Sequence, residues 1–471
     1  METKLISIPA MPETGSLACL IPDDGSIPFR LSAEELALWE KRPAKPGQVL
    51  IQRLPHFLFL VNPDYKKENH LVLESCRKAG ARWMDHVKSE KITELTIVGF
   101  TQADHLLAFT EGFLLAGYTF HRHRKEKDDF MPETVNIVHS GVGEEQLREL
   151  WIVVKAAWWA RNMVNEPLSH LTAVTFAEEI ASKGEEAGFS VEIFHKKKIE
   201  SLKMGGLLAV NKGSIDPPTF TVLEWKPENA VNSRPIVLAG KGIVYDTGGL
   251  SLKPTSKSMD YMKSDMAGAA AVAATLYAAS LNHLPVHLIG LIPATDNRPD
   301  GNAFVPGDII TMFDGTTVEV MNTDAEGRLL LGDALSYAKK YDPLLVIDLA
   351  TLTGAASIIA GNQGIIAMGN TPENMEKLKS AGNTVYERIV ELPLWEEFGE
   401  SLKSDIADMS NLGGREGQTI VAGKFLEHFT DYPWIHLDIA GTAWLFEKES
   451  WKPRGGTGSG IRLLYNFLKK F

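Results

Sequence analysis

The segment Pro235-Ile236-Val237-Leu238-Ala239-Gly240 is an apolar run with β-branched residues, and it ends directly before Lys241. Such a run is typical of a strand that is buried on both faces of a parallel sheet. Helical patterns alternate with further apolar runs at 286–292, 318–321, 344–349 and 434–439. This alternation predicts an α/β fold in which helices cover both faces of a largely parallel central sheet.

The length of the chain, 471 residues, predicts two or three domains of about 150 residues each. Residues 145–165 have the pattern of a long helix, which carries Trp151, Trp158 and Trp159, and we place a domain boundary within it. The sequence therefore predicts a smaller N-terminal α/β domain over residues 1–150, in which we identify no chemistry. A larger catalytic α/β domain is predicted over residues 151–471.

Composition and charge limit the kinds of binding partner and the cellular location that we expect for this protein. The net charge of −12 argues against nucleic acids and anionic membranes as partners. Cys19 and Cys76 are the two cysteines, so no disulfide framework is expected. The first residues lack the apolar region of a signal peptide, and no run reaches the roughly 18 apolar residues of a spanning helix. We expect a cytoplasmic protein with no membrane association.

Charged residues gather just after the apolar runs. Four of them lie at or near the boundaries of predicted elements: Lys241, Asp246, Lys253 and Asp265. A second group follows the run at 318–321, in the segment Asn322-Thr323-Asp324-Ala325-Glu326-Gly327-Arg328-Leu329. Because ligands bind at the carboxyl ends of strands in open α/β sheets, we expect the two groups to converge.

The acidic residues allow two interpretations. Thr323 and Glu326 have the spacing of a capping box for the helix predicted from Arg328 to about Tyr341, and each charge taken singly fits a solvated turn. Together, however, the four carboxylates would repel one another in an apolar setting unless cations neutralised them. A pair of divalent metal ions with oxygen ligands would do so, and such pairs catalyse hydrolysis. The combination of both groups favours a metal site.

Several segments resemble signature blocks of the leucyl aminopeptidase family, which are two-metal exopeptidases. The main blocks are GKGIVYDTGGLSLKP (240–254), MKSDMAGAAAV (262–272), NTDAEGRL (322–329) and DLATLTGA (348–355). Supporting blocks are ARNMVNEP (160–167), GNAFVPGDII (301–310), HLDIAGTAW (436–444) and GGTGSGIRLL (455–464). The blocks occur in the order of the family, so the resemblance covers roughly residues 150 to 471.

The resemblance implies a role for each matching residue. Five residues match the metal ligands of the family: Lys241, Asp246, Asp265, Asp324 and Glu326. Of these, Asp246 and Glu326 match the bridging ligands, whereas Lys253 and Arg328 match the two catalytic cations. Six residues fall where the family lines its first specificity pocket: Met262, Thr351, Leu352, Gly354, Ala440 and Ala443.

The resemblance also implies a reaction. A water that bridges two divalent ions, most fittingly Zn²⁺ or Mn²⁺, would attack the peptide bond after an N-terminal Leu or other apolar residue. One metal would bind the free α-amine, and Lys253 would stabilise the oxyanion. Arg328 would hold a bicarbonate that carries the proton to the leaving amine. The substrates would be peptides with a free N-terminus, and the protein would be a homohexamer.

Two other functions are compatible with parts of the pattern. A different two-metal carboxylate hydrolase, such as a phosphoesterase, would use the same ligand types, but the apolar residues Met262, Leu352 and Ala440 weigh against a phosphate substrate. An inactive scaffold of the same fold would have lost ligands, and all are present. The charged segments 297–300 and 413–419 depart from the family and leave the substrate preference open.

Overall fold

The computed structural model describes residues 3–41, 47–126 and 130–471, and the chain forms two compact units. The first unit runs to Trp158 and includes the short segments Thr384–Tyr386 and Glu447–Arg454, whereas the rest of the chain forms the second. The division after Trp158 falls within helix α4 (Glu144–Asn165), the helix in which the boundary at 150/151 was predicted. Among the described residues, every helix is too short or too polar to cross a bilayer.

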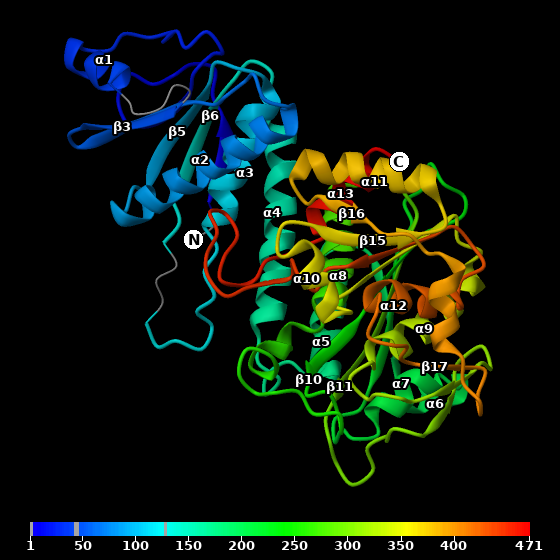
Figure 1. The fold of residues 1–471 in the computed structure, drawn as a ribbon. Helices are drawn as coiled ribbons and strands as arrows, with labels where there is room; N and C mark the ends of the chain where they lie inside the picture. Colours follow the sequence, from blue (N-terminus) through cyan, green and yellow to red (C-terminus); the bar gives the residue numbers. More distant parts are fainter. Residues whose placement is uncertain (1–2, 42–46, 127–129) are drawn as a thin grey trace. The chain divides into compact units, whose positions relative to one another are not determined.

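The first unit is an α/β structure around one six-stranded sheet (Figure 1). The strand order is β1-β6-β5-β2-β4-β3, and every pair is parallel except β3 with β4. The strands are β1 (Lys4–Ser7), β2 (Ser16–Leu20), β3 (Gly47–Arg53), β4 (His56–Asn62), β5 (Glu94–Gly99) and β6 (Thr134–Val138). The helices are α1 (Ala33–Glu40), α2 (Asn69–Ser89) and α3 (Ala103–Ala116).

The second unit is built on a nine-stranded sheet in the order β16-β15-β18-β14-β9-β11-β8-β7, with β10 beside β11. Its strands are β7 (Ser190–His195), β8 (Thr219–Trp225), β9 (Ile236–Gly240), β10 (Gly242–Asp246), β11 (Leu288–Asn297), β14 (Leu345–Ala350), β15 (Ile365–Gly369), β16 (Ile389–Glu391) and β18 (Trp434–Asp438). The centre, β11-β9-β14-β18, is parallel, and antiparallel pairs flank it. The predicted parallel α/β sheet is confirmed for these four strands.

The apolar run at 318–321 is not part of this sheet, so that prediction was wrong. It contributes β13 (Thr317–Glu319) to a separate three-stranded sheet with β12 (Ile309–Thr311) and β17 (Met409–Ser410). Val318 and Val320 are buried, but Met321 is 51% exposed. Because Thr317 and Glu319 alternate with the valines, the pattern is that of a half-buried strand rather than of a central one.

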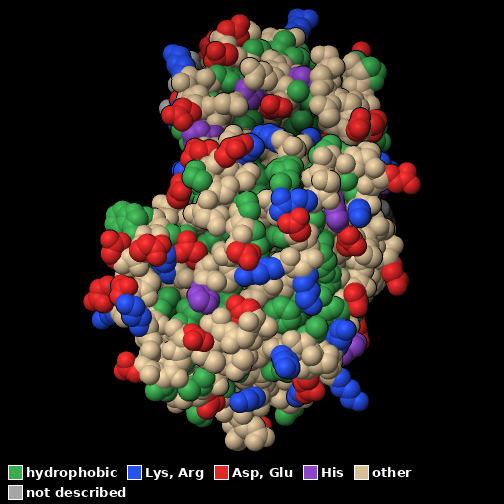
Figure 2. Space-filling model, turned by 90° about the vertical axis from the view of Figure 1, so that its right-hand side faces the viewer, with side chains coloured by type: hydrophobic (Ala, Val, Ile, Leu, Met, Phe, Trp, Pro, Cys, Tyr) green, Lys and Arg blue, Asp and Glu red, His purple; other side chains and the backbone are tan. Residues whose placement is uncertain are grey.

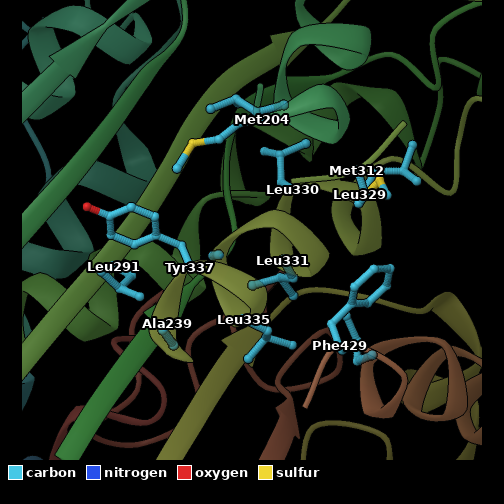
Figure 3. Close-up of a cluster of buried hydrophobic side chains, with 14 of the residues drawn as sticks. Met204, Ala239, Leu291, Met312, Leu329, Leu330, Leu331, Leu335, Tyr337 and Phe429 are labelled. Carbon is cyan, nitrogen blue, oxygen red and sulfur yellow. The ribbon is translucent and has the colours of Figure 1, made fainter. Parts of the chain in front are cut away.

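Helices cover both faces of the central strands. On one face lies α8 (Ala267–Leu281), whose small residues let it approach the sheet closely: a Cβ at Gly268 would lie 2.0 Å from the carbonyl oxygen of Leu349. On the other face, α9 (Gly327–Ala338) packs with α7 (Gly205–Asn211) and α12 (Gln418–Glu427). Figure 3 shows side chains of α9, such as Leu331 and Tyr337, in one buried cluster with Ala239 of β9 and Leu291 of β11.

Further helices and short strands complete the second unit. They are α5 (Ala173–Ala187), α6 (Lys196–Leu202), α10 (Gly354–Ala360), α11 (Pro372–Val385), α13 (Ile461–Lys469), β19 (Trp444–Leu445), β20 (Gly455–Gly456) and the 3₁₀ helices η1 (Met259–Ser264), η2 (Lys339–Tyr341) and η3 (Glu396–Leu402). On the face shown in Figure 2, acidic and basic side chains are interspersed. This face therefore carries charges of both signs side by side.

Candidate active site

The predicted site residues meet in the second unit, at the carboxyl ends of its central strands. Lys241 directly follows β9, Asp246 is the last residue of β10, and Thr351 directly follows β14. A cavity of about 460 Å³ opens at this edge of the sheet, and its walls include every predicted site residue except Glu326. The parallel strands thus bring together residues that lie far apart in the sequence.

Three carboxylates form the centre of the site. Asp246, Asp265 and Glu326 are each at most 4% exposed, and each offers an oxygen that lies within 4.8 Å of the other two. Within the described part of the chain, the buried Oε2 of Glu326 has no hydrogen-bond partner. Crowded, buried and incompletely bonded carboxylate oxygens are the donor set that hard divalent cations require, so these residues fit a metal centre.

Lys241 lies between two of these carboxylates. Its Nζ is 2.9 Å from both Asp265 Oδ2 and Glu326 Oε1, and it donates a hydrogen bond to the carbonyl of Thr351 at 2.9 Å. Burial lowers the pKa of Lys241, but the neighbouring carboxylates raise it by more, so the pKa lies above its ordinary value. Gly327 makes room for this side chain, because a Cβ there would lie 2.4 Å from Lys241 Cε.

Lys253 and Asp324 complete the charged cluster. Lys253 Nζ is 2.9 Å from Asp246 Oδ2 and also pairs with Asp324. Burial, together with the charges of Asp246 and Glu326, raises the pKa of Asp324 to about 7. Burial is also the largest cause of the raised pKa of Asp265 and of Glu326. Four carboxyl groups thus face two ammonium groups, and burial together with the crowding of like charges opposes their full ionisation unless further cations neutralise them.

The capping-box interpretation of Thr323 and Glu326 was wrong. Glu326 is itself the residue before the first turn of α9, and no side chain caps that helix. The hydroxyl of Thr323 instead donates to the carbonyl of Gly248 at 2.6 Å and accepts from the N–H of Ser251 at 2.8 Å. Thr323 thus fastens the two charged segments to each other, and the carboxylate of Glu326 faces the cluster.

Arg328 is the second residue of α9 and lines the cavity. It is 5% exposed, donates from Nη1 to the carbonyl of Asn411 at 2.8 Å, and lies with its guanidinium 5.9 Å from the centre of the Phe425 ring. Burial lowers the pKa of Arg328 to about 10, so the group is a cation at neutral pH. Among the described residues, its buried Nε has no hydrogen-bond partner. A buried cation with a free donor is suited to binding an anion.

The expected pocket residues all line the cavity, and four of them are apolar: Met262, Thr351, Leu352, Gly354, Ala440 and Ala443. Thr351 links this lining to the carboxylates, because its hydroxyl donates to Asp265 Oδ1 at 2.7 Å. An apolar wall therefore adjoins an acidic cluster. Such a cavity suits a ligand that carries an apolar side chain next to an amine.

Two buried residues of the site were missed in the sequence. Asn297, at the end of β11, donates from Nδ2 to Asp246 Oδ1 at 2.8 Å and to the carbonyl of Thr323 at 3.0 Å. Asp438, at the end of β18, accepts hydrogen bonds from the N–H groups of Leu352, Thr353 and Ala440 at 3.0–3.2 Å. Both lie at the carboxyl ends of core strands, and this position is the signal that could have found them.

Comparison with known proteins places the chain in a family. Residues 158–465 match the model of the cytosol aminopeptidase family, catalytic domain. A probable cytosol aminopeptidase of Chlorobaculum tepidum is 47% identical over 375 residues, which cover 76% of this chain and 74% of that protein. Another, from a Geobacter species, is 40% identical over 415 residues, which cover 86% of this chain and 84% of that protein.

Solved structures agree over almost the whole chain. The bottromycin maturation enzyme BotP in complex with Mn has a TM-score of 0.86 and 29% identity, covering 97% of this chain and 99% of that one. A mutant of tomato leucine aminopeptidase has a TM-score of 0.89 and 26% identity, covering 100% of this chain and 97% of that one. The family match and the buried carboxylate cluster agree: this chain belongs to the cytosol aminopeptidase family and is a metal-dependent exopeptidase that hydrolyses peptides.

Proposed function

We propose that this aminopeptidase removes Leu or another apolar residue from the free N-terminus of peptides, in the cavity at the end of β9. The observation that carries the proposal is the buried cluster of Asp246, Asp265 and Glu326, whose oxygens lie within 4.8 Å of one another beside an apolar wall. The wall suits the side chain of the first residue. The acidic cluster suits its amine.

The charged cluster would hold two divalent metal ions per chain, Zn²⁺ or Mn²⁺, through Lys241, Asp246, Asp265, Asp324 and Glu326. Support comes from the excess negative charge of the cluster and from the Mn in the similar structure of BotP. Held there, such ions would supply a nucleophilic water and would polarise the peptide carbonyl. Asp246 and Glu326 would bridge the two ions. Lys241 would coordinate one of them as the neutral amine, because two nearby dications would oppose the effect of the carboxylates and disfavour the ammonium form.

The chain supplies two further cations for the reaction. Lys253, which extends from the loop after β10 into the cavity, would stabilise the negative charge that develops on the carbonyl oxygen. Arg328 would hold a bicarbonate through its free Nε and keep that anion against the cavity. The bicarbonate would carry a proton to the leaving amine.

Organisation beyond the site is also proposed. By the resemblance to leucyl aminopeptidases, the chain would work as a homohexamer in the cytoplasm, with residues 1–150 as a separate N-terminal domain and 151–471 as the catalytic domain. The two compact units of the structure support a division close to that boundary.

Paired substrates test the proposed function. With added Mn²⁺, the purified protein is expected to cleave leucine p-nitroanilide and to leave its N-acetyl derivative intact, because the cluster requires a free amine. p-Nitrophenyl phosphate serves as the third substrate and is expected to remain intact, since apolar residues line the pocket. Equal rates on the free and acetylated anilides would end the exopeptidase proposal, and hydrolysis of the phosphate alone would favour a phosphoesterase.

A further inference from the structure

Asn411, directly after β17, is fully buried beside the loop that carries Asp324 and Glu326. Both polar atoms of its side chain bond to the backbone of that loop. Oδ1 accepts from the N–H groups of Met321 at 2.7 Å and Asn322 at 3.3 Å. Nδ2 donates to the carbonyls of Asn322 at 2.8 Å and Ala325 at 3.3 Å. The side chain thus holds the loop at both ends of Asp324.

The backbone of Asn411 makes two further hydrogen bonds, one to Arg328 and one to β13. Its carbonyl accepts the hydrogen bond from Arg328 Nη1 at 2.8 Å, and its N–H donates to the carbonyl of Glu319 in β13 at 2.9 Å. The next residue, Leu412, lines the cavity. Asn411 is therefore the point at which the small sheet, the acidic loop and the guanidinium are joined.

We propose that Asn411 is a positioning residue that sets the geometry of Asp324, Glu326 and Arg328 for the aminopeptidase reaction, and this inference rests on the proposed function. The loop takes part in four hydrogen bonds with the side chain, two as donor and two as acceptor. An amide is the side chain that offers both an acceptor and two donors at this length. The loop has little repeating structure of its own, so its shape depends on these bonds.

A carboxylate in the place of the amide tests this role with almost no change in volume. Asn411→Asp keeps the bonds to Met321 and Asn322 N–H but sets an oxygen against the carbonyls of Asn322 and Ala325. The loop is then expected to shift, and with it the two acidic side chains. Groups that orient metal ligands typically change affinity or turnover by about 10- to 100-fold when they are substituted.

Asn232 offers a matched control at the opposite end of the strands. It is 7% exposed, donates from Nδ2 to the carbonyls of Arg234 and His287 at 2.9 Å, and accepts from the N–H of His287 at 2.8 Å. It precedes β9, whose far end carries Lys241. Asn232→Asp therefore breaks the same kind of bonds without touching the site.

The experiment compares both variants with the unchanged protein. Mn²⁺ affinity is measured by calorimetry on metal-stripped protein, kcat and KM on leucine p-nitroanilide, and folding by circular dichroism and thermal melting. For Asn411→Asp we expect Mn²⁺ affinity and kcat each to fall at least about tenfold. KM should change less than kcat, because Asn411 is not among the residues that line the cavity. For Asn232→Asp we expect a lower melting temperature with Mn²⁺ affinity and kcat within about twofold of the unchanged protein.

Asn411→Ser, which replaces the amide by a shorter hydroxyl side chain and adds no charge, takes the place of Asn411→Asp in every comparison if the latter does not fold. The inference is overturned if the folded Asn411 variant keeps its Mn²⁺ affinity and kcat, or if its losses equal those of Asn232→Asp at the same loss in melting temperature. Failure of the unchanged protein to cleave leucine p-nitroanilide would instead contradict the proposed function. The two failures are therefore distinguishable.

Discussion

Asp324 and Glu326 are expected to be needed for metal binding rather than for helix stability. Asp324→Asn and Glu326→Gln should each lower the metal content and abolish most activity. The fold should remain, because the hydroxyl of Thr323 bonds to Gly248 and Ser251 and no capping bond at α9 is lost. Elemental analysis, an anilide assay and circular dichroism measure the three effects. A fully active Glu326→Gln protein with normal metal content would contradict the ligand role.

Lys241 distinguishes a metal ligand from a simple counterion. An ammonium has no lone pair, so Lys241 can coordinate only after it has released a proton, whereas an arginine stays protonated. Lys241→Arg is therefore expected to lose at least one metal ion per chain and most activity. If Lys241 only balances Asp265 and Glu326, which lie 2.9 Å away, arginine should substitute well. Two metal ions and near-normal turnover in the variant would support that simpler role.

Sequence reasoning at this scale worked where charges cluster and failed where a polar residue stands alone. The segments around Lys241 and Asp324 could be predicted because several charges in an apolar setting need a common explanation. Asn297 and Asp438 lie singly at strand ends, and their role depends on which backbone groups face them. The tertiary structure determines which backbone groups bond to these two side chains, and a single sequence does not show it.

At the scale of elements, the close approach of α8 to the sheet requires a residue without a side chain at position 268, and this requirement can be tested. An added Cβ would lie 2.0 Å from the carbonyl of Leu349, so Gly268→Ala must move the helix or the strand. We expect it to destabilise the protein by about 1–3 kcal/mol, as overpacking usually does. By helix propensity alone, alanine would stabilise the helix by roughly 1 kcal/mol over glycine. A lower free energy of unfolding in the variant would therefore show that the clash of the added Cβ with Leu349 outweighs helix propensity.

Urea unfolding of Gly268→Ala measures this effect, with Gly399→Ala as its control. A Cβ at Gly399 would make an ordinary contact of 3.5 Å with Lys424 Cε. The urea midpoint of Gly399→Ala should therefore differ little from that of the unchanged protein. Equal stability of Gly268→Ala and the unchanged protein would show that α8 can shift without strain.

The elements themselves were predictable to different degrees. The run that became β9 is apolar throughout, and those that became β14 and β18 are mostly apolar, so burial on both faces could be predicted. The run at 318–321 alternates with polar residues and pairs with β17, about ninety positions later in the chain. No local pattern indicates such a distant partner, and the small sheet was therefore not predicted.

For the whole molecule, the resemblance to leucyl aminopeptidases predicts a homohexamer. Light scattering on the purified protein should give about six times the chain mass of 51.8 kDa. The measurement is made at micromolar concentration, with and without added Mn²⁺. A monomer under both conditions would show that this chain does not share the expected assembly.

The proposed metal ligands come from separate stretches of the chain: the end of β9, the end of β10, the residue that follows η1, and the loop before α9. An unfolded chain does not gather these side chains, so the ions would bind the native state alone. By mass action, a free metal concentration one hundred times the dissociation constant adds about 2.7 kcal/mol to the free energy of unfolding. Metal supply would thus govern how long each molecule survives proteases that attack opened chains, as well as how fast it works.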